Sequence, residues 1–369
     1  MSTFAVVTGG GTAGHVLPAL AVAEALTASG HDATNVHYVG CTRGMETRLV
    51  PETEYPHTFF DVVGFQRSLS RRNLSFVPKM LRARRDAVAL LRRLDPKVVV
   101  SVGGYASMPA VFAARKLNIP VVVVSYDRQP GRASQLSART AAACAVAFEN
   151  SPLPHAEVTG APVRQEILRL NRDRDRSAAR TRLGIPADRY LVAVMGGSLG
   201  SGVLNNEIAA YVERHRNDSG VAVRQVAGER FVETITELGV VENGIIHQVV
   251  GYEPDMAAVY AAADVLIGRG GASTVHEVAV TGVPAVLVPW SGAADDHQTG
   301  NVEWLSEVGA AVLMTEAELG DLGDEIERLR ADSARSAALS AAALQRGEVH
   351  RSGALARLIE RVALTSPTS

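Results

Sequence analysis

The sequence predicts an α/β protein made of two doubly wound, Rossmann-like domains, each with a parallel sheet. Short apolar runs of the buried-strand type alternate with longer helical segments along the chain. A glycine-rich turn follows the first strand of each half, at Gly9–Gly14 and again at Gly196–Gly200, so the strand, turn and helix order is repeated. With 369 residues the chain exceeds one ordinary hydrophobic core, which also favours two domains.

Composition and charge exclude several classes of protein. Apolar residues make up 47% of the chain and aromatic residues 5%, which is typical of an alanine- and valine-rich α/β protein. The formal net charge of −2 gives no global attraction to nucleic acid, so no nucleic-acid partner is expected. Cys41 and Cys144 are too few for a disulfide framework and lie in no Cys/His cluster, which predicts a reducing compartment and no zinc site.

No segment of the sequence has the pattern of a signal peptide or of a membrane span. The first residues lead directly into an expected strand, Phe4–Thr8, without basic and apolar leader regions. No uninterrupted apolar run reaches about 18 residues, the length needed to cross a bilayer. We therefore expect a cytosolic protein.

The first glycine turn lies between that strand and a helix expected to run to about Ser29. Its glycines match the GxGxxG pattern of dinucleotide-binding proteins, a weak match by itself. A dinucleotide site also needs an acidic residue after the second strand, to bind the ribose. Here the strand at His37–Val39 is followed by Gly40 and Cys41, which disfavours an oxidoreductase.

His15 stands at the start of the same helix. A histidine there has a pKa near working pH and could serve as a general base for an acceptor hydroxyl that approaches the glycine backbone. The alternative is a helix-capping or core histidine.

Residues 67–93 form the most basic stretch of the chain, with nine basic side chains and one acidic one. Apolar residues are interleaved among the basic ones, the pattern of a protein that rests on an anionic bilayer surface. The alternative is a solvated helix whose apolar stripe packs on its own sheet, which we expect beyond Met80. We therefore predict membrane contact for residues 67–82 only.

Further strands and helices are expected in both halves. Two strands of the first half lead into polar turns, and a short extended segment is expected at Glu157–Thr159. Residues 171–182 are polar and charge-mixed, which suggests a linker, and the tail at Glu318–Leu364 is predicted helical with an interruption at Gly347 and Glu348. The other expected elements are strands at Val98–Val102, Val121–Val124, Leu191–Met195, Val221–Val226 and Ile245–Val249, and helices from about Val203, at Phe231–Leu238 and through Met256 and Tyr260.

The stretch Asp264–Asn301 carries the strongest functional pattern. A short buried strand, a turn with two glycines and the helix Ser273–Thr281 follow one another, and such a helix start favours an anion such as a diphosphate. Arg269 could add positive charge, and Glu277, one helical turn after Ser273, could accept both hydroxyls of a ribose. The alternatives are a packing glycine, a capping residue and a solvated carboxylate.

A polar loop follows the next strand, Ala285–Val288, and contains His297, Gln298 and Asn301. Ligands of open parallel sheets bind outside the carboxyl ends of the strands, so this loop and the preceding glycine turn are expected to share one site.

Several strings together resemble one known family. The run RGGASTVHEVAVTGVPAVLVP with the following DDHQTGNVEWLSEVGAA, the GGTAGH string of the first turn, the GGYxS turn and the GxPVR string are similar to the MurG family of N-acetylglucosaminyltransferases, glycosyltransferase family 28. The resemblance covers essentially the whole chain. It implies the GT-B fold, in which two Rossmann-like domains face each other across a cleft. The implied boundaries are 1–165 for the acceptor domain, 166–348 for the donor domain and 349–369 for a helix that crosses back.

The resemblance also implies an activity and its site. An inverting transferase of this kind moves N-acetylglucosamine from UDP-N-acetylglucosamine to the 4-hydroxyl of the muramoyl pentapeptide of lipid I, which makes lipid II at the cytoplasmic side of the cell membrane. His15 and Asp127 are the implied catalytic residues, and Gly104, Tyr105, Ser107 and Asp127 lie on the acceptor side. The implied donor ligands are Thr12, Gly14, Arg164, Ser198, Arg269, Gly271, Ala272, Ser273, Thr274, Glu277, His297, Gln298 and Asn301. No DxD motif is present and no metal or other cofactor is implied.

One loop departs from the family pattern. Alignment on Pro130–Gly131 puts Val124, Ser125, Tyr126 and Asp127 where the family has a His-Glu-Gln-Asn string. This keeps open a GT-B transferase that acts on another lipid or on an antibiotic aglycone. A sugar-nucleotide epimerase and a noncatalytic nucleotide-binding module are less favoured alternatives.

Overall fold

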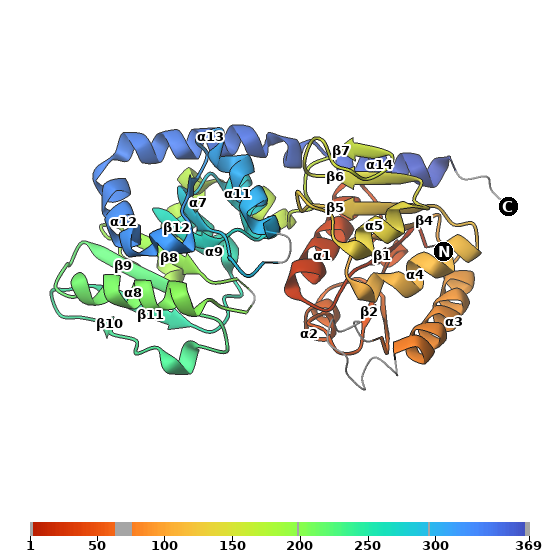
Figure 1. Cartoon of the computed structure of the whole chain (residues 1–369), viewed down its shortest axis with the longest axis horizontal. Helices are drawn as coiled ribbons and strands as arrows, with labels where there is room; N and C mark the ends of the chain where they lie inside the picture. The colour runs from red at the N-terminus through yellow and green to blue at the C-terminus, as the bar shows by residue number, and fades with distance from the viewer. Residues whose placement is uncertain (1–2, 63–75, 198, 294–295, 366–369) are drawn as a thin grey trace. The chain divides into compact units, whose positions relative to one another are not determined.

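The structure, a computed structural model, describes residues 3–62, 76–197, 199–293 and 296–365. The chain divides into two compact units (Figure 1). Unit 1 contains residues 1–165 together with 349–369, and unit 2 contains residues 166–348. Each unit has one seven-stranded sheet, which confirms the predicted fold class of two Rossmann-like halves.

Unit 1 is a parallel sheet in the order β3-β2-β1-β4-β5-β6-β7. Its central strands are short runs of valine and alanine whose side chains are buried on both faces, as a sheet covered by helices requires. The strands are β1 Ala5–Thr8, β2 Val36–Cys41, β3 His57–Phe60, β4 Val98–Ser101, β5 Val121–Ser125, β6 Ala143–Val146 and β7 Ala156–Val158.

Unit 1 contains the helices α1 to α5 from the first part of the chain and the helix α14 from its C-terminal part. The last one, α14, packs on α1 and on the sheet strands β4 and β6 (Figure 1, blue among the yellow strands). Cys41 and Cys144 are both buried and free. The helices are α1 Ala13–Ala28, α2 Glu46–Leu49, α3 Phe76–Leu94, α4 Met108–Lys116, α5 Arg132–Ala138 and α14 Ala354–Leu364.

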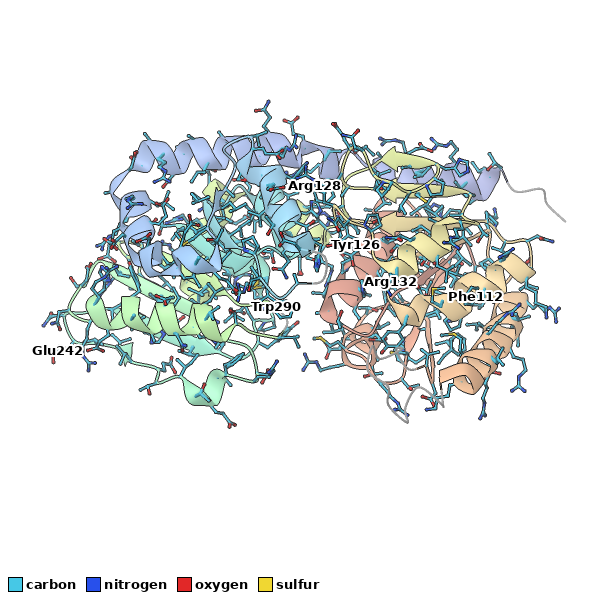
Figure 2. The ribbon with its side chains drawn as sticks, viewed as in Figure 1. Phe112, Tyr126, Arg128, Arg132, Glu242 and Trp290 are labelled. Atoms are coloured by element: carbon cyan, nitrogen blue, oxygen red, sulfur yellow. The ribbon has the colours of Figure 1, made fainter. Side chains whose placement is uncertain are left out.

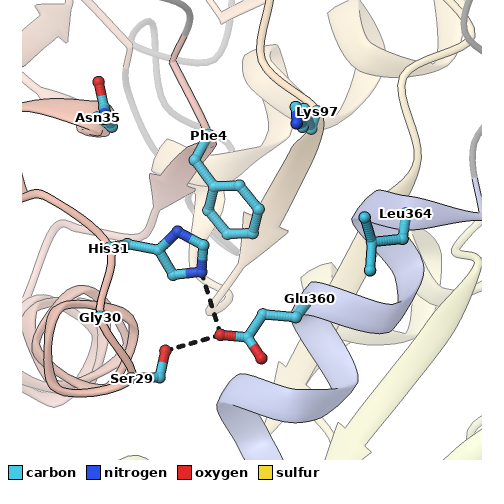
Figure 3. Close-up of a pocket in the computed structure, with 8 residues that line it drawn as sticks. All are labelled: Phe4, Ser29, Gly30, His31, Asn35, Lys97, Glu360 and Leu364. Atoms are coloured by element: carbon cyan, nitrogen blue, oxygen red, sulfur yellow. Dashed lines mark hydrogen bonds and ion pairs between the residues drawn. The ribbon is translucent and has the colours of Figure 1, made fainter.

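A polar clasp holds α14 at the end of α1 (Figure 3). The Glu360 carboxylate accepts hydrogen bonds from Ser29 at 2.8 Å and from His31 Nε2 at 3.1 Å, and Phe4 stacks on His31 with ring centroids 3.7 Å apart. These residues line a cavity of about 520 Å³ that also includes Lys97. Because Phe4 and Lys97 precede β1 and β4, the cavity lies at the amino ends of the strands, opposite the edge where parallel sheets bind ligands.

Unit 2 is a second sheet in the order β10-β11-β9-β8-β12-β13-β14. All its pairs are parallel except the short β10, which is antiparallel to β11. The strands are β8 Tyr190–Met195, β9 Val221–Val226, β10 Gly239–Val240, β11 Ile246–Val250, β12 Val265–Arg269, β13 Ala285–Val288 and β14 Val312–Leu313. The helices are α6 Gln165–Leu168, α7 Arg172–Leu183, α8 Gly202–Arg214, α9 Met256–Ala262, α10 Ala272–Thr281, α11 His297–Ser306, α12 Leu322–Ala331 and α13 Ser333–Arg351.

The linker predicted at 171–182 is wrong, because these residues form the helix α7 packed against α9. Its arginines serve as a polar packing face. Arg172 donates to the carbonyls of Tyr260 and Gly282, and Arg180 pairs with Asp264 at 2.7 Å. The periodicity of arginines at i, i+4 and i+8 thus marks a helix face, although no apolar stripe is present.

Two other predicted elements differ from the structure. The helix expected at 231–238 is a single 3₁₀ turn, Val232–Thr234, since β-branched residues dominate and the chain then extends into β10. The expected interruption at Gly347 and Glu348 is also wrong. The helix α13 passes through Gly347, where a side chain would collide with the Ala279 carbonyl. The helical tail is interrupted instead at Asp332 and at Gly353, which has φ 71°.

The strand orders define where a ligand is expected. In unit 1 the order reverses at β1 and β4, and in unit 2 it reverses at β8 and β12, so the crevice of each sheet opens beyond the carboxyl ends of these strands. The turns that follow them are the glycine turns of the sequence, Gly9–Gly14 and Gly103–Gly104 in unit 1, and Gly196–Gly200 and Gly270–Gly271 in unit 2.

Candidate active site

The first glycine turn of unit 1 is filled by a carboxylate of the protein itself. Glu46, fully buried at the start of α2, accepts from the Gly11 N–H at 3.1 Å through each of its oxygens and from the Cys41 N–H at 2.9 Å. A phosphate at the Gly11 N–H would meet this negative charge. The geometry therefore agrees with the sequence argument against a dinucleotide at this turn.

His15 lies beside the turn, third in α1. Its Nδ1 is 2.9 Å from the hydroxyl of Tyr126, which also donates to the carbonyl of Gly14. Gly104 lies against the imidazole, since a Cβ built at this glycine would be 2.9 Å from Cδ2 of His15, and its φ of 75° also favours glycine. Burial lowers the pKa of His15, while the negative charges of Asp127 and Glu46 act to raise it.

The predicted acceptor-side residues fall into two groups. Asp127 follows β5 and is near enough to His15 to act on its charge. Ser107 is buried and donates to the Gly104 carbonyl at 2.8 Å, and the Tyr105 hydroxyl is 3.9 Å from the Cys41 sulfur. Ser107 and Tyr105 thus shape the turn that holds His15.

Unit 1 also contains three residues predicted to bind the donor. Thr12 is the exposed N-cap of α1, and its side chain makes no capping hydrogen bond. Gly14 is exposed and its carbonyl accepts from Tyr126. Arg164 is half-buried and pairs through Nε with Glu24 at 2.6 Å, which ties the end of the first domain to α1.

The two glycines at the start of α10 have different surroundings. A Cβ at Gly270 would be 2.7 Å from both the Gln298 carbonyl and Val302, so this glycine is required by the packing of α11. Gly271, the N-cap of α10, has φ −64° and open space where a side chain would project. Among the described residues, no side chain accepts from the N–H groups of 271–274. This helix start has free donors and the positive end of the helix dipole.

Glu277 lies one helical turn beyond Ser273 on α10, and both are half-buried. The fully buried Tyr260 of α9 donates its hydroxyl to Glu277 Oε2 at 2.6 Å, which fixes the carboxylate. An ionised carboxylate retains further lone pairs for ribose hydroxyls. Thr274 and Ala272 are buried at the helix start.

Arg269 ends β12 with its guanidinium largely buried. It pairs with Glu316 at 2.7 Å and donates to the carbonyls of Val288 and Pro289 at 3.3 and 3.4 Å. Its charge is compensated within the protein. Arg269 therefore joins β12, β13 and the Glu316 segment, and its predicted contact with a phosphate stays a prediction.

The polar residues of α11 differ in burial and in hydrogen-bond partners. Asn301 is fully buried and donates to the Gly270 carbonyl at 3.3 Å, so it supports the turn, and its predicted contact with a sugar hydroxyl stays a prediction. Gln298 is half-buried and accepts from the Trp290 N–H at 2.9 Å. His297, the first residue of α11, is half-buried.

Parts of two predicted regions lie outside the described residues. Ser198 is one of them, and residues 67–75 of the basic segment are the others. In the described part of α3, Leu81 is 59% exposed and lies beside Arg82 and Arg85, which are also exposed, while Ala83 and Ala87 enter the core. No helix within the described ranges is long and apolar enough to cross a membrane.

Sequence reasoning missed four residues that support the site, namely Glu46, Tyr126, Tyr260 and Glu316. In the sequence, Tyr126 stands out only because its loop departs from the family's His-Glu-Gln-Asn string. Glu46 lies 35 residues from Gly11, and no local pattern connects the two. Across the described residues, no group of three or more His, Cys, Asp or Glu side chains could hold a metal ion.

Comparisons with known proteins agree with this geometry. The N-terminal domain model of glycosyltransferase family 28 matches residues 5–146, and the C-terminal domain model of the same family matches residues 191–354. Two relatives carry the name UDP-N-acetylglucosamine–N-acetylmuramyl-(pentapeptide) pyrophosphoryl-undecaprenol N-acetylglucosamine transferase. The protein from Nocardioides sp. is 38% identical over 91% of both chains, and that from Desulforudis audaxviator is 34% identical over 97% of this chain and 98% of its own.

A solved structure extends the likeness to three dimensions. The crystal structure of Acinetobacter baumannii MurG matches with a TM-score of 0.69 and 26% identity, over 99% of this chain and 100% of the other. This match confirms the expected GT-B class of two Rossmann-like domains. With both family models and near full-length relatives in agreement, the chain belongs to glycosyltransferase family 28.

Proposed function

We propose that this protein is the inverting transferase that moves N-acetylglucosamine from UDP-N-acetylglucosamine to the 4-hydroxyl of the muramoyl pentapeptide of lipid I, which forms lipid II for peptidoglycan. One observation carries the proposal. At the start of α10 the N–H groups at Gly271–Thr274 have no side-chain acceptor in the part of the chain that the structure describes. One turn further on, Tyr260 holds the Glu277 carboxylate in place. Diphosphate and ribose recognition thus come from a single helix.

The donor binds through its nonreacting part. The diphosphate accepts hydrogen bonds from the N–H groups at the start of α10 and from the hydroxyls of Ser273 and Thr274. The ribose hydroxyls donate to Glu277. Ser198, His297 and Gln298 complete the donor contacts, Asn301 and Arg269 hold the turn, and Thr12, Gly14 and Arg164 contribute from unit 1. Binding energy from the uridine diphosphate orients C1 of the sugar for attack.

His15 acts as the general base of the reaction. It takes the proton of the acceptor 4-hydroxyl while that oxygen forms a bond with C1 of the sugar. The bond between C1 and the diphosphate breaks, and uridine diphosphate leaves with the bonding electrons. Helix dipoles and N–H donors stabilise the leaving group without a metal ion. One displacement inverts the configuration at C1.

The acceptor is held in the membrane by its polyprenyl chain, so we propose that the protein binds peripherally to the cytoplasmic leaflet through residues 67–82. The exposed Leu81 beside Arg82 supports this, because an apolar side chain next to a basic one suits an anionic surface. Sedimentation with anionic and zwitterionic vesicles tests it. Selective binding to the anionic vesicles that weakens in Leu81→Glu is expected, and equal binding to both would contradict it.

The function is tested by incubation with radiolabelled UDP-N-acetylglucosamine and lipid I. Product should form with this pair and not with UDP-glucose or with lipid II as acceptor. His15→Ala should lose about 10²- to 10⁴-fold in kcat. Since burial lowers the pKa of His15 below 6.5, the acid limb of the pH profile for kcat/KM should lie below pH 6.5. Absence of transfer to lipid I would contradict the proposal.

A second candidate keeps the donor and changes the acceptor. The loop at Val124–Asp127 differs from the family string on the acceptor side, and this favours a GT-B transferase for another lipid or an aglycone as the alternative. Full activity with a soluble aglycone and none with lipid I would select it.

A further inference from the structure

The Tyr126 hydroxyl makes two hydrogen bonds that constrain each other. Tyr126 is the labelled residue of Figure 2 that follows β5, and its side chain is buried. Its oxygen meets the Gly14 carbonyl and, at 2.9 Å, Nδ1 of His15. A carbonyl only accepts, so the single hydroxyl proton of Tyr126 points to Gly14. The oxygen is then left as an acceptor for His15, and the proton of that bond must be on Nδ1.

We propose that Tyr126 is a positioning residue that holds neutral His15 with its proton on Nδ1 and so presents an unprotonated Nε2 to the acceptor hydroxyl. This inference rests on the proposed function, in which His15 is the base. Without a fixed tautomer, part of the protein at any moment would carry the proton on the nitrogen that must accept one.

Packing around the ring supports the same orientation. Gly104 lies against the edge of the imidazole, and a Cβ at this position would be 2.9 Å from Cδ2 of His15. A Cβ at Gly103 would be 3.7 Å from Cε1. The backbone at Gly103 and Gly104 thus restricts rotation of the imidazole. A ring flip that exchanged Nδ1 and Cδ2 would in addition break the bond to Tyr126.

The electrostatic surroundings keep both partners in the required state. Burial raises the pKa of Tyr126 well above its usual value, so the hydroxyl retains the proton that it gives to Gly14. Burial also lowers the pKa of His15, against the opposing charges of Asp127 and Glu46, so the neutral ring is favoured near neutral pH. Because Nδ1 already contacts Tyr126, Asp127 influences His15 through its charge and does not occupy this nitrogen.

Tyr38 provides a matched control. It is also a buried tyrosine, and its hydroxyl donates to the carbonyl of Gly9 in the same glycine turn, at 2.6 Å. Among the described residues, the Tyr38 hydroxyl bonds to Gly9 and not to His15. Tyr38→Phe therefore removes one buried hydrogen bond to the turn, as Tyr126→Phe does, and leaves the Nδ1 partner in place.

The first test reads the tautomer directly. Histidine labelled with ¹⁵N in the full chain gives ring-nitrogen shifts for the ten histidines, and loss of one set in His15→Gln assigns His15. The wild type and Tyr38→Phe should show a protonated Nδ1 and an unprotonated Nε2. In Tyr126→Phe the two ring nitrogens should shift toward a mixture of tautomers. A wild-type spectrum with the proton on Nε2 overturns the proposal, even if Tyr126→Phe does not fold.

The second test reads catalysis. Tyr126→Phe should lower kcat about tenfold, the ratio that corresponds to one lost hydrogen bond, while KM for UDP-N-acetylglucosamine changes less than about twofold. Tyr38→Phe should keep the wild-type tautomer and a smaller change in kcat. Equal loss in both variants, or a shifted tautomer with unchanged kcat, overturns the positioning role. Retained activity in His15→Ala would instead remove His15 as the base, whatever tautomer the spectra show.

Discussion

The glycine turns before α1 and α10 have the same local design but differ in whether a side chain of the protein accepts from their N–H groups. Each joins a buried parallel strand to the start of a helix at the switch point of its sheet. In unit 1 the Glu46 carboxylate already accepts from the Gly11 N–H. In unit 2 the N–H groups of 271–274, at the start of α10 itself, lack a side-chain acceptor in the described ranges. A glycine-rich turn is therefore an anion site only when the protein leaves its donors unused.

Removal of Glu46 should have the largest effect on stability. Glu46→Ala leaves the Gly11 and Cys41 N–H groups buried without an acceptor and opens a cavity, which should cost about 3 kcal/mol of unfolding free energy. Thermal or urea unfolding measures it, with the exposed Glu54→Ala as the control. UDP affinity should stay near the wild-type value. A stability equal to that of the control would show that this carboxylate does not hold the turn.

An internal anion placed at the open turn should abolish donor binding without loss of stability. In Gly271→Asp the carboxylate would cap α10 in open space, as Glu46 fills the first turn, and repel the diphosphate. UDP affinity should fall about 100-fold, and the unfolding temperature should not decrease. Calorimetric titration with UDP measures the change. Gly271→Asn caps the helix without the charge and should lose much less, so equal losses in the two variants would argue against an electrostatic cause.

The neighbouring glycine should respond in a different way. Gly270→Ala places a methyl group 2.7 Å from the Gln298 carbonyl and Val302 and should cost about 2 kcal/mol of stability. Gly271→Ala has open space and should cost less than about 1 kcal/mol. Unfolding of the two variants side by side checks this difference. Comparable losses would mean that both glycines serve packing.

The smallest expected effect concerns the second part of the open site. Tyr260→Phe removes the hydrogen bond that orients Glu277, and UDP affinity should fall about fivefold. Pyrophosphate has no ribose, so its affinity should not change. A parallel loss for both ligands would place the effect on the helix start and not on Glu277.

Local patterns predicted much of this molecule, because buried strands and glycine turns leave a mark on neighbouring residues. Both turns, the strand series and the central stretch at Asp264–Asn301 were recognisable in this way. The difference between the turns was not, since Glu46 reaches Gly11 across 35 residues. Asn301 and Arg269 are predicted ligands because they are polar residues near the carboxyl ends of strands, and the sequence does not reveal their partners inside the protein, the Gly270 carbonyl and Glu316.

The position of α14 has a consequence for synthesis on the ribosome. This helix packs on α1, β4 and β6, so the sheet that emerges first is covered by a segment translated after the whole of unit 2. A nascent chain with residues 1–165 already outside the exit tunnel would expose the apolar surface that Leu358, Ile359 and Val362 later cover. All strands of unit 2 are translated before α14. Unit 2 can therefore complete its sheet before unit 1 is covered, although unit 2 comes later in the chain.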